Sequence, residues 1–289
     1  MRSRPHTVHK GVAMKILRNG FIALASLYLL LLLAFFVFQR SLLYFPSPDS
    51  TSLKEAHANP AFRQLPIRTE DGLNLKAWYA PATSKPFTFV FFHGNGESLQ
   101  DSAYVADPYI EAGYGFLVTE YRGYSGLPGK PTESGLYQDG RACIHALNSQ
   151  GVQTGNILLF GHSLGTGVAV EMATEFPVGG LILLAPYLSI PKVAQVHYPF
   201  IPAEILALDR FNNAAKIGHI HAPLLIVNGV NDQVVPPSQG QHLYDLASEP
   251  RQFHSLPHHD HNDLFDDFAP IGIDWVSRVC GKGTGPASS

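Results

Sequence analysis

The pentapeptide Gly161-His162-Ser163-Leu164-Gly165 places a serine between two glycines, each two residues away from it. It follows the apolar run NILLF and precedes GVAVEMATEF, a stretch of helical length. A Gly-x-Ser-x-Gly motif at a strand-to-helix turn exposes the serine hydroxyl on a cramped turn, where side chains at the glycine positions would collide with neighbouring backbone. We therefore predict that Ser163 is a nucleophile.

A second glycine-rich turn, His93-Gly94-Asn95-Gly96, closes the apolar run FTFVFF. Glycines at such a turn let backbone N–H groups face a reacting carbonyl, where paired donors stabilise the developing negative charge. The N-terminus of the helix after Ser163 supplies free N–H groups and the positive end of its dipole. We predict the backbone N–H groups of Asn95 and Leu164 as the two donors. Without Ser163, an ordinary glycine-rich turn would be the better interpretation.

A serine nucleophile needs a base, and the base needs an acid that holds it. Asp232 lies just past the apolar run PLLIVN, in GVNDQVVP. A carboxylate at the carboxyl end of a buried strand lies at the edge of the sheet where sites form. We predict Asp232 as the acid, and an ordinary turn residue is the alternative interpretation. Asp209 is a weaker rival because no strand precedes it in its segment.

The base has several candidates in the segment HSLPHHDHND, namely His254, His258, His259 and His261. His261 stands just before a predicted closing helix that begins at Asn262 and Asp263, with an acidic cap. We predict His261 as the base and His259 as the second choice. A metal site is the rival interpretation of a histidine-rich tract. Because no paired ligand cluster occurs elsewhere in the sequence, we expect neither a metal nor a cofactor.

The elements that must position these residues alternate between strands and helices. Apolar runs without polar alternation indicate strands buried on both faces, at residues 87–92, 114–121, 156–160, 181–185, 223–228 and 252–256. Helix-length stretches lie between and after them, at residues 98–112, 134–149, 164–176, 237–248 and 263–279. This order predicts an α/β fold with a mostly parallel sheet and helices on both faces. A hairpin over residues 65–81 is expected to turn at Asp71 and Gly72.

From about residue 60 to 278 the chain resembles the α/β-hydrolase superfamily, and it is most similar to a branch of membrane-anchored acyl hydrolases and serine-aminopeptidase-like proteins. The motifs FQRSLLYFP, FFHGNGES, YRGYSGLPGKPTE, GHSLG, GVNDQVVP and HNDLF occur in the order that this branch uses. The resemblance implies the α/β-hydrolase fold, with Ser163 as nucleophile, Asp232 as acid and His261 as base. The chain departs from the family at Ser125 and Leu127, where the family usually has Gly and Ser.

An apolar segment precedes this domain. Residues Phe21 to Phe38 form 18 consecutive positions without a charge. A helix of that length spans about 27 Å, close to the hydrocarbon thickness of a bilayer. We predict a transmembrane anchor that contacts the bilayer through residues 21–38. A cleaved signal peptide is the alternative, which the length of the apolar segment and the lack of a small-x-small site in FFVFQRS disfavour.

Basic residues gather before the apolar segment and few follow it. Those before it are Arg2, Arg4, Lys10, Lys15 and Arg18, and those after it are Arg40 and Lys54. The positive-inside rule then leaves the N-terminus in the cytoplasm and the main domain outside it, in a periplasm or lumen. The expected organisation is a basic N-terminus over residues 1–20, an anchor over 21–38, a linker over 39–60, a catalytic domain over 61–280 and a disordered tail over 281–289.

Residues 187–220 are expected to cover the serine as a short lid. Tyr187, Leu188, Tyr198 and Phe200 suit an apolar acyl chain, and packing of the lid itself is the alternative interpretation. We expect hydrolysis of lipid-derived or other apolar acyl esters through an acyl-enzyme. Thioesters or amides are alternative substrates, and a non-catalytic anchored binding protein is the alternative of another class.

Composition excludes other classes of protein. A formal net charge of −3 over 289 residues provides no field that favours nucleic acid, so we expect no nucleic-acid partner. The two cysteines, Cys143 and Cys280, are too few for a disulfide framework or a cysteine zinc site. Because their helices are expected on opposite faces of the sheet, beyond the reach of a disulfide, we predict two free thiols.

Overall fold

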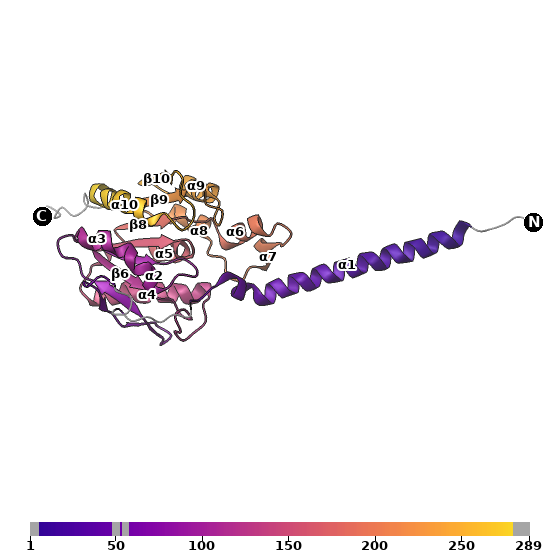
Figure 1. The fold of residues 1–289 in the computed structure, drawn as a ribbon, viewed down its shortest axis with the longest axis horizontal. Coiled ribbons are helices and arrows are strands. Elements are labelled where there is room, and N and C mark those ends of the chain that lie inside the picture. Colours follow the sequence, from indigo (N-terminus) through magenta and orange to yellow (C-terminus); the bar gives the residue numbers. More distant parts are fainter. Residues whose placement is uncertain (1–5, 48–52, 54–57, 280–289) are drawn as a thin grey trace, which may run out of the picture. The chain divides into compact units, whose positions relative to one another are not determined.

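The computed structural model in Figure 1 describes residues 6–47, 53 and 58–279. The chain divides into two units, Met1–Leu43 and Tyr44–Ser289. The described part of the first unit is a single helix, α1 (His6–Leu43). The second unit holds the strands and the remaining helices.

Helix α1 contains a candidate membrane span, Ala13–Leu43, in which an 18-residue window has a mean hydropathy of 2.8. By length and composition it could cross a membrane, and a signal sequence would pass the same test. The helix extends beyond both limits of the predicted segment 21–38. Those limits enclose only the most apolar part of an uncharged stretch, and Lys and Arg, which lie beyond that stretch, are themselves good helix formers.

The predicted linker over residues 39–60 differs from the structure at its start. Residues 39–43 complete α1. Tyr44 is only 3% exposed, the N–H of Phe45 donates to Oδ1 of Asn95 at 2.9 Å, and the carbonyl of Ser47 accepts from the N–H of Ser125 at 2.8 Å. Residues 44–47 are therefore part of the second unit, because their backbone is bonded to two of its loops.

The main sheet has eight strands in the order β1-β4-β6-β5-β7-β8-β9-β10. The pairs β1–β4 and β4–β6 are antiparallel and the others are parallel. The bounds are β1 Arg63–Gln64, β4 Ala77–Ala80, β5 Thr88–Phe92, β6 Gly115–Thr119, β7 Ile157–His162, β8 Gly180–Leu184, β9 Leu224–Gly229 and β10 Arg251–Leu256. Each residue of the five strands β5 to β9 is buried, as helices on both faces require.

The predicted hairpin is present but shorter than expected. β2 (Ile67–Arg68) pairs with β3 (Asn74–Leu75) around a turn in which Gly72 has a φ of 89°. The chain then continues into β4, which joins the main sheet. The predicted range therefore combined a small hairpin with an antiparallel strand of the larger sheet.

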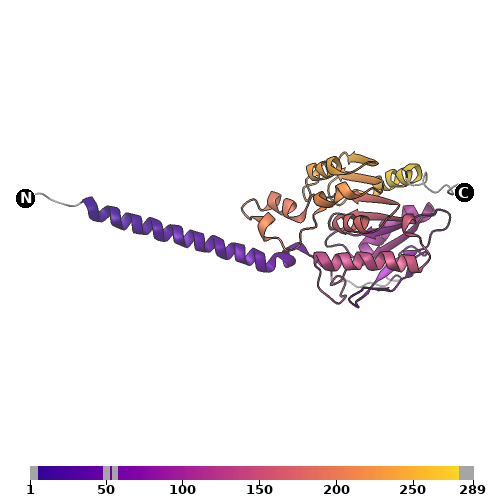
Figure 2. The same ribbon diagram turned by 180° about the vertical axis from the view of Figure 1, so that it is seen from behind.

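Helices cover both faces of the sheet, as predicted. One layer contains α4 (Glu133–Ser149), α5 (Leu164–Glu175), α8 (Asn213–Lys216) and α9 (Pro237–Leu246), and the view from behind in Figure 2 brings α4 and α5 to the front. The other contains α2 (Leu99–Ala103), η1 (Tyr104–Ala106), α3 (Asp107–Glu111) and α10 (Phe265–Val279). Two short helices, α6 (Ile190–His197) and α7 (Ala203–Leu206), form with α8 and η3 (Ile217–His219) the segment predicted as a lid.

The predicted helix over residues 98–112 is three short pieces, α2, η1 and α3. Pro108 lies in the first turn of α3, where a residue without an N–H is tolerated, whereas it would interrupt a continuous helix. The opposite placement of α4 and α10 agrees with the argument for free thiols. Cys143 in α4 is buried and free. Cys280 and the tail 281–289 lie outside the described residues.

Candidate active site

Ser163 stands at a tight turn between β7 and α5. Its φ of 47° and ψ of −116° are rare for a residue with a side chain and occur where surrounding structure enforces them. A Cβ on Gly161 would lie 2.6 Å from the carbonyl oxygen of Gly165, and a Cβ on Gly165 would lie 1.9 Å from that of Phe92. The predicted strand-turn-helix around Ser163 is present, and the two glycines are needed for the reason predicted.

The side chains of Ser163, His261 and Asp232 form one chain of hydrogen bonds. Nε2 of His261 lies 2.8 Å from Oγ of Ser163, and Nδ1 of the same ring lies 2.7 Å from Oδ2 of Asp232. An ionised carboxylate only accepts, so Nδ1 carries the proton of the neutral ring and Nε2 accepts from the serine hydroxyl. The arrangement can activate a hydroxyl as a nucleophile by general-base catalysis.

The loop after β9 holds Asp232 in place. Oδ1 of Asp232 accepts from the backbone N–H groups of Val234 and Val235, at 2.8 Å each. Oδ2 of Asp232 is therefore available for the imidazole of His261. The N–H of Asn231 donates to the carbonyl of His259 at 2.9 Å, which joins this loop to the one after β10. The acid and the base are therefore fixed by neighbouring strands of one sheet.

The rival candidates have other partners. The ring of His259 contacts the carbonyl of Pro257 at 2.9 Å and the carboxylate of Asp267 at 3.0 Å. Asp209 accepts from the backbone N–H of Glu133, at 3.2 Å, where α4 begins. The hydroxyl of Ser163 is hydrogen-bonded to His261, and the ring of His261 is hydrogen-bonded to Asp232.

Asp263 does not cap the closing helix, contrary to prediction. α10 begins at Phe265, and Oδ1 of Asp263 accepts from the N–H of Asp260 at 2.8 Å. The carboxylate thus stabilises the loop that carries His261. A short polar side chain satisfies a loop N–H as readily as a helix N-terminus, and the sequence alone does not distinguish the two.

Asn95 and Leu164, the predicted oxyanion donors, follow adjacent strands, since β5 pairs with β7. The side chain of Asn95 is held firmly: its Oδ1 accepts from the N–H of Phe45 and, at 2.8 Å, from the hydroxyl of Tyr124. Leu164 is the first residue of α5, where an N–H has no acceptor within the helix. Both backbone groups lie on turns that adjoin Ser163.

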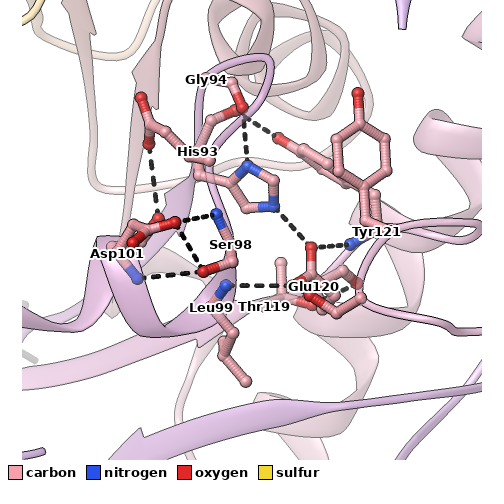
Figure 3. Close-up of polar contacts among 12 residues, drawn as sticks. His93, Gly94, Ser98, Leu99, Asp101, Thr119, Glu120 and Tyr121 are labelled. Carbon is pink, nitrogen blue, oxygen red and sulfur yellow. Dashed lines mark hydrogen bonds and ion pairs between the residues drawn. The ribbon is translucent and has the colours of Figure 1, made fainter. Parts of the chain in front are cut away.

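Figure 3 shows how His93 is fixed at the end of β5. Its Nδ1 lies 2.8 Å from the carbonyl oxygen of Gly94, and its Nε2 lies 2.9 Å from Oε1 of Glu120. Both acceptors lack a proton, so both ring nitrogens donate and the ring is a cation. Burial lowers the pKa of His93, but the hydrogen bond and charge of Glu120 outweigh burial, and the pKa is raised.

Glu120, directly after β6, accepts further donors. They are the backbone N–H groups of Leu99 at 3.0 Å and Tyr121 at 3.2 Å, and the hydroxyl of Ser125 at 2.6 Å. Burial raises the pKa of Glu120, and the contacts with His93 bring it below its ordinary value. Ser125 stands at a φ of 47°, which explains why the family usually has Gly there. Here its hydroxyl joins the carboxylate network.

Three residues beside the site escaped the sequence analysis: Glu97, Glu120 and His162. A signal for them was present, because Glu120 and His162 are titratable residues at the end of an apolar strand and Glu97 lies in the turn after another. Buried charges need partners, so glutamates and histidines at adjacent strand ends could have been paired. Their pairing nevertheless depends on the strand order, which the sequence does not state.

The four predicted lid contacts divide into two pairs. Tyr187 is buried and its hydroxyl donates to the carbonyl of Leu164 at 3.1 Å, so it supports the turn at Ser163. Leu188 lines a surface cavity between α6, α8 and α9. The substrate-binding role of both residues stays a prediction. Tyr198 and Phe200 are exposed between α6 and α7.

Among residues 6–47, 53 and 58–279, no three His, Cys, Asp or Glu side chains are grouped so that they could hold a metal ion. The histidines after β10 are accordingly distributed among different partners. His259 and His261, for example, pair with Asp267 and Asp232.

Comparison with known proteins agrees with this fold. Residues 85–216 match the family described as serine aminopeptidase, S33. The chain is 30% identical to the human alpha/beta hydrolase domain-containing protein 17B over 200 residues, which are 68% of each chain. The protein therefore belongs to the α/β-hydrolase superfamily, and it is a hydrolase. It is also 37% identical, over 233 residues, to an uncharacterized protein of Mycobacterium tuberculosis, covering 78% of this chain and 81% of that one.

Solved structures support the same fold. An alpha-beta hydrolase from Vibrio vulnificus matches with a TM-score of 0.69 and 22% identity, covering 82% of this chain and 92% of that one. The esterase domain of a Rhodothermus marinus protein matches with a TM-score of 0.60 and 19% identity, covering 76% and 99%. At these identities the likeness concerns the arrangement of the sheet and helices.

Proposed function

We propose that the protein is a membrane-anchored serine hydrolase that cleaves apolar acyl esters through an acyl-enzyme intermediate. The observation that supports this most directly is the hydrogen-bonded chain from Ser163 through His261 to Asp232. A scaffold has no physical need for a strained serine whose hydroxyl is bonded to a buried, carboxylate-oriented imidazole.

In the proposed reaction, Oγ of Ser163 attacks the acyl carbonyl while Nε2 of His261 takes its proton. Asp232 holds the ring and stabilises the imidazolium. The imidazolium then protonates the leaving alkoxide, and the acyl group remains on Ser163. A water molecule, deprotonated by the same nitrogen, attacks the acyl-enzyme. The bond from the acyl carbon to Oγ then breaks, the imidazolium returns the proton to Oγ of Ser163, and the acid is released.

The backbone N–H groups of Asn95 and Leu164 are the proposed donors to the oxyanion. In a trans peptide the carbonyl of Gly94 and the N–H of Asn95 point in opposite directions. His93 binds that carbonyl, so the imidazole fixes the orientation of the peptide that carries the donor. Removing one such donor typically costs about 10²- to 10³-fold in kcat.

The proposed preference for apolar acyl groups rests on the lid and on where the chain enters the second unit. The lid exposes apolar side chains, of which Ile205 is 82% exposed. Burial and the nearby carboxylate of Asp209 raise the pKa of the Tyr44 phenol, which places Tyr44 beside this segment. Phe45 in turn contacts the turn after β5. The chain thus passes from the apolar helix directly to the active-site edge of the sheet.

Labelling with a fluorophosphonate probe tests whether the protein is an enzyme. We expect the wild-type protein to be labelled and to hydrolyse p-nitrophenyl esters, with kcat/KM rising as the acyl chain lengthens. Ser163→Ala should abolish both, whereas His259→Ala, which alters a histidine of the same loop, should retain most activity. A wild-type protein that neither reacts nor hydrolyses would support a binding protein, and comparison with matched thioesters and amides defines the bond that is cleaved.

The proposed orientation places the N-terminus in the cytoplasm and the hydrolase unit outside it, because the basic residues precede the apolar span. A reporter fused after Ser289 should therefore be active only outside the cytoplasm. A reporter that is active in the cytoplasm would overturn this orientation and leave the proposed chemistry intact.

A further inference from the structure

His162 lies between the three proposed catalytic residues and Glu97. Its Nδ1 is 2.7 Å from Oε1 of Glu97, and its Nε2 is 3.1 Å from the backbone carbonyl oxygen of His261. The ring is buried, with the ring of His261 centred 5.3 Å away and that of Phe265 4.9 Å away. One imidazole therefore contacts the backbone of the proposed base and a carboxylate from another loop.

The partners of His162 define its protonation. A carbonyl oxygen only accepts, so Nε2 donates to His261, and an ionised carboxylate only accepts, so Nδ1 donates to Glu97. The ring is an imidazolium while both contacts are made. Burial raises the pKa of Glu97, but the charge and hydrogen bond of His162 outweigh it and bring the pKa to about 2. Burial lowers the pKa of His162, and Glu97 outweighs it and raises the pKa.

The pair also touches the turn after β5. A Cβ on Gly94 would lie 2.5 Å from Oε1 of Glu97 and 2.9 Å from Nδ1 of His162, so the backbone of that turn packs directly against both groups. Because His162 precedes Ser163, the pair joins three loops: the turn with the proposed oxyanion donor, the turn with the nucleophile and the loop with the base.

Other charged or polar groups face this pair from each neighbouring element. Ser102 in α2 donates to Oε2 of Glu97 at 3.4 Å. His93 after β5 also acts on Glu97, and Asp232 after β9 acts on His162. Tyr104 in η1 lies near Glu97, and it also lies near Asp101 in α2 and Asp266 in α10. Within the described part of the chain, the hydrogen bonds of the His162 ring reach one carboxylate, that of Glu97.

We propose that Glu97 and His162 are a positioning pair that holds the backbone of His261, and with it the imidazole, in line with Ser163. This inference rests on the proposed function, because it assigns a role relative to the base His261. The pair does not touch substrate. It acts through the carbonyl of His261, so its loss lowers kcat and leaves KM nearly unchanged.

The pair makes kcat fall at alkaline pH. When His162 loses a proton, the carboxylate of Glu97 keeps the remaining hydrogen on Nδ1. The lone pair of Nε2 then faces the carbonyl of His261 and repels it. Glutamine at position 97 behaves differently, because its amide NH₂ can donate to Nδ1 and leave the hydrogen of a neutral ring on Nε2. Glu97→Gln thus preserves the geometry without charge.

The test compares full-length wild type, Glu97→Ala and Glu97→Gln by kcat and KM from pH 6 to about 10, with Glu111→Ala on α3 as the surface control. We expect Glu97→Ala to lose tenfold or more in kcat with KM within twofold. Glu97→Gln should keep most of kcat and lack the alkaline fall that wild type shows. The control should match wild type.

Two results would overturn the proposal: an Ala variant with kcat within twofold of wild type, or a Gln variant with the alkaline fall of wild type. If thermal melting shows that the Ala variant is unfolded, the pH profile of the Gln variant alone decides. A Ser163→Ala protein that remains as active as wild type would instead refute the proposed function, so the two failures are distinguishable.

Discussion

Ser163 can adopt its positive φ only because the residues two positions away carry no Cβ. At Gly165 an added methyl group would meet a backbone oxygen of β5, which no side-chain rotation can remove. Because Gly165 has no side chain, the N-terminus of α5 packs directly against the end of β5 and the turn that follows it. The same contact brings the two proposed oxyanion donors together.

Gly165→Ala tests this close contact. We expect the free energy of unfolding to fall by about 1–3 kcal/mol, because overpacking forces the backbone to shift, and probe labelling of Ser163 to be lost. Gly155→Ala is the matched control, since a Cβ there has no neighbour within 4 Å. Urea unfolding and labelling measure both effects, and equal behaviour of the two variants would contradict the argument.

His93 and His162 make the stability of the fold depend on pH in a definite direction. Both have pKa values raised above the ordinary value of 6.5. The stability that these two histidines contribute is fully present below pH 6.5. It is lost as the pH rises through their raised pKa values. Each should lower the free energy of unfolding by up to about 1.4 kcal/mol per pH unit in that range. Glu97, with a pKa of about 2 against 4.5, loses its contribution only in acid.

Urea midpoints measured from pH 5 to 9 check this expectation. The midpoint should decline above about pH 6.5, and Glu120→Gln, which removes the charge that faces His93, should decline less steeply. A midpoint that stays constant across the range in wild type would show that the two rings do not carry the protons that their contacts require.

At the scale of elements, Arg122 joins three segments that are distant in the sequence. Its guanidinium donates to Asp139 in α4 through Nε at 2.9 Å and to Asp71 in the hairpin turn through Nη1 at 2.8 Å. The backbone N–H of Arg122 also donates to Asp139 at 2.9 Å. This arginine lies in the loop after β6 and therefore fixes the hairpin and α4 against the edge of the site.

Arg122→Ala should destabilise the protein by about 3–5 kcal/mol, because it leaves the fully buried carboxylate of Asp139 without its cation. Arg141→Ala is the control. Arg141 lies in α4, like Asp139, and forms a bidentate ion pair with Glu175 that is partly exposed. Loss of this pair should cost about 1 kcal/mol or less. Thermal melting of the two variants measures both losses of stability. Similar losses would contradict the argument that the buried ion pair matters more than the exposed one.

The elements that sequence reasoning found are those whose signal is local. Continuous apolar runs revealed the buried parallel strands, and the glycine spacing revealed the turn at Ser163. The helix before Gly113 was predicted as one piece because the effect of Pro108 depends on its position within the turn. The partners of Glu97, Glu120 and His162 were not predicted, because they come from different strand ends and depend on strand order. His261 was distinguished from His259 by its place before the closing helix and by the resemblance of HNDLF to the family motif.

At the scale of the whole molecule, an apolar helix directly precedes a unit whose first residues reach the active-site edge. Leu43 follows Phe38 by five positions, which is about 7.5 Å of helix. Ile205 of the lid is 82% exposed, and we predict that this apolar side chain contacts lipid when the protein is anchored. Ile205→Trp in full-length protein reconstituted with brominated lipids should show quenched fluorescence, because the native Trp78 and Trp275 are buried.

Glu111→Trp is the matched control for this measurement. Glu111 ends α3 directly before β6 and so lies toward the opposite edge of the sheet from Ser163. We expect no quenching there. Equal fluorescence of the two variants in brominated and ordinary lipid would show that the lid does not meet the acyl chains, and ester hydrolysis by the same samples reports the chemistry independently.

The contacts of residues 44–47 have a practical consequence for anyone who cuts this chain, whether with a protease or by shortening the gene. A soluble fragment that starts at Tyr44 keeps the N–H of Phe45 on Asn95 and the carbonyl of Ser47 on Ser125. A fragment that starts at Pro60, although it retains all eight strands of the sheet, loses both contacts. The first fragment should react with a fluorophosphonate as the full chain does, and the second should react more slowly. The functional border of the hydrolase therefore lies at the end of the apolar helix, and not at the first strand.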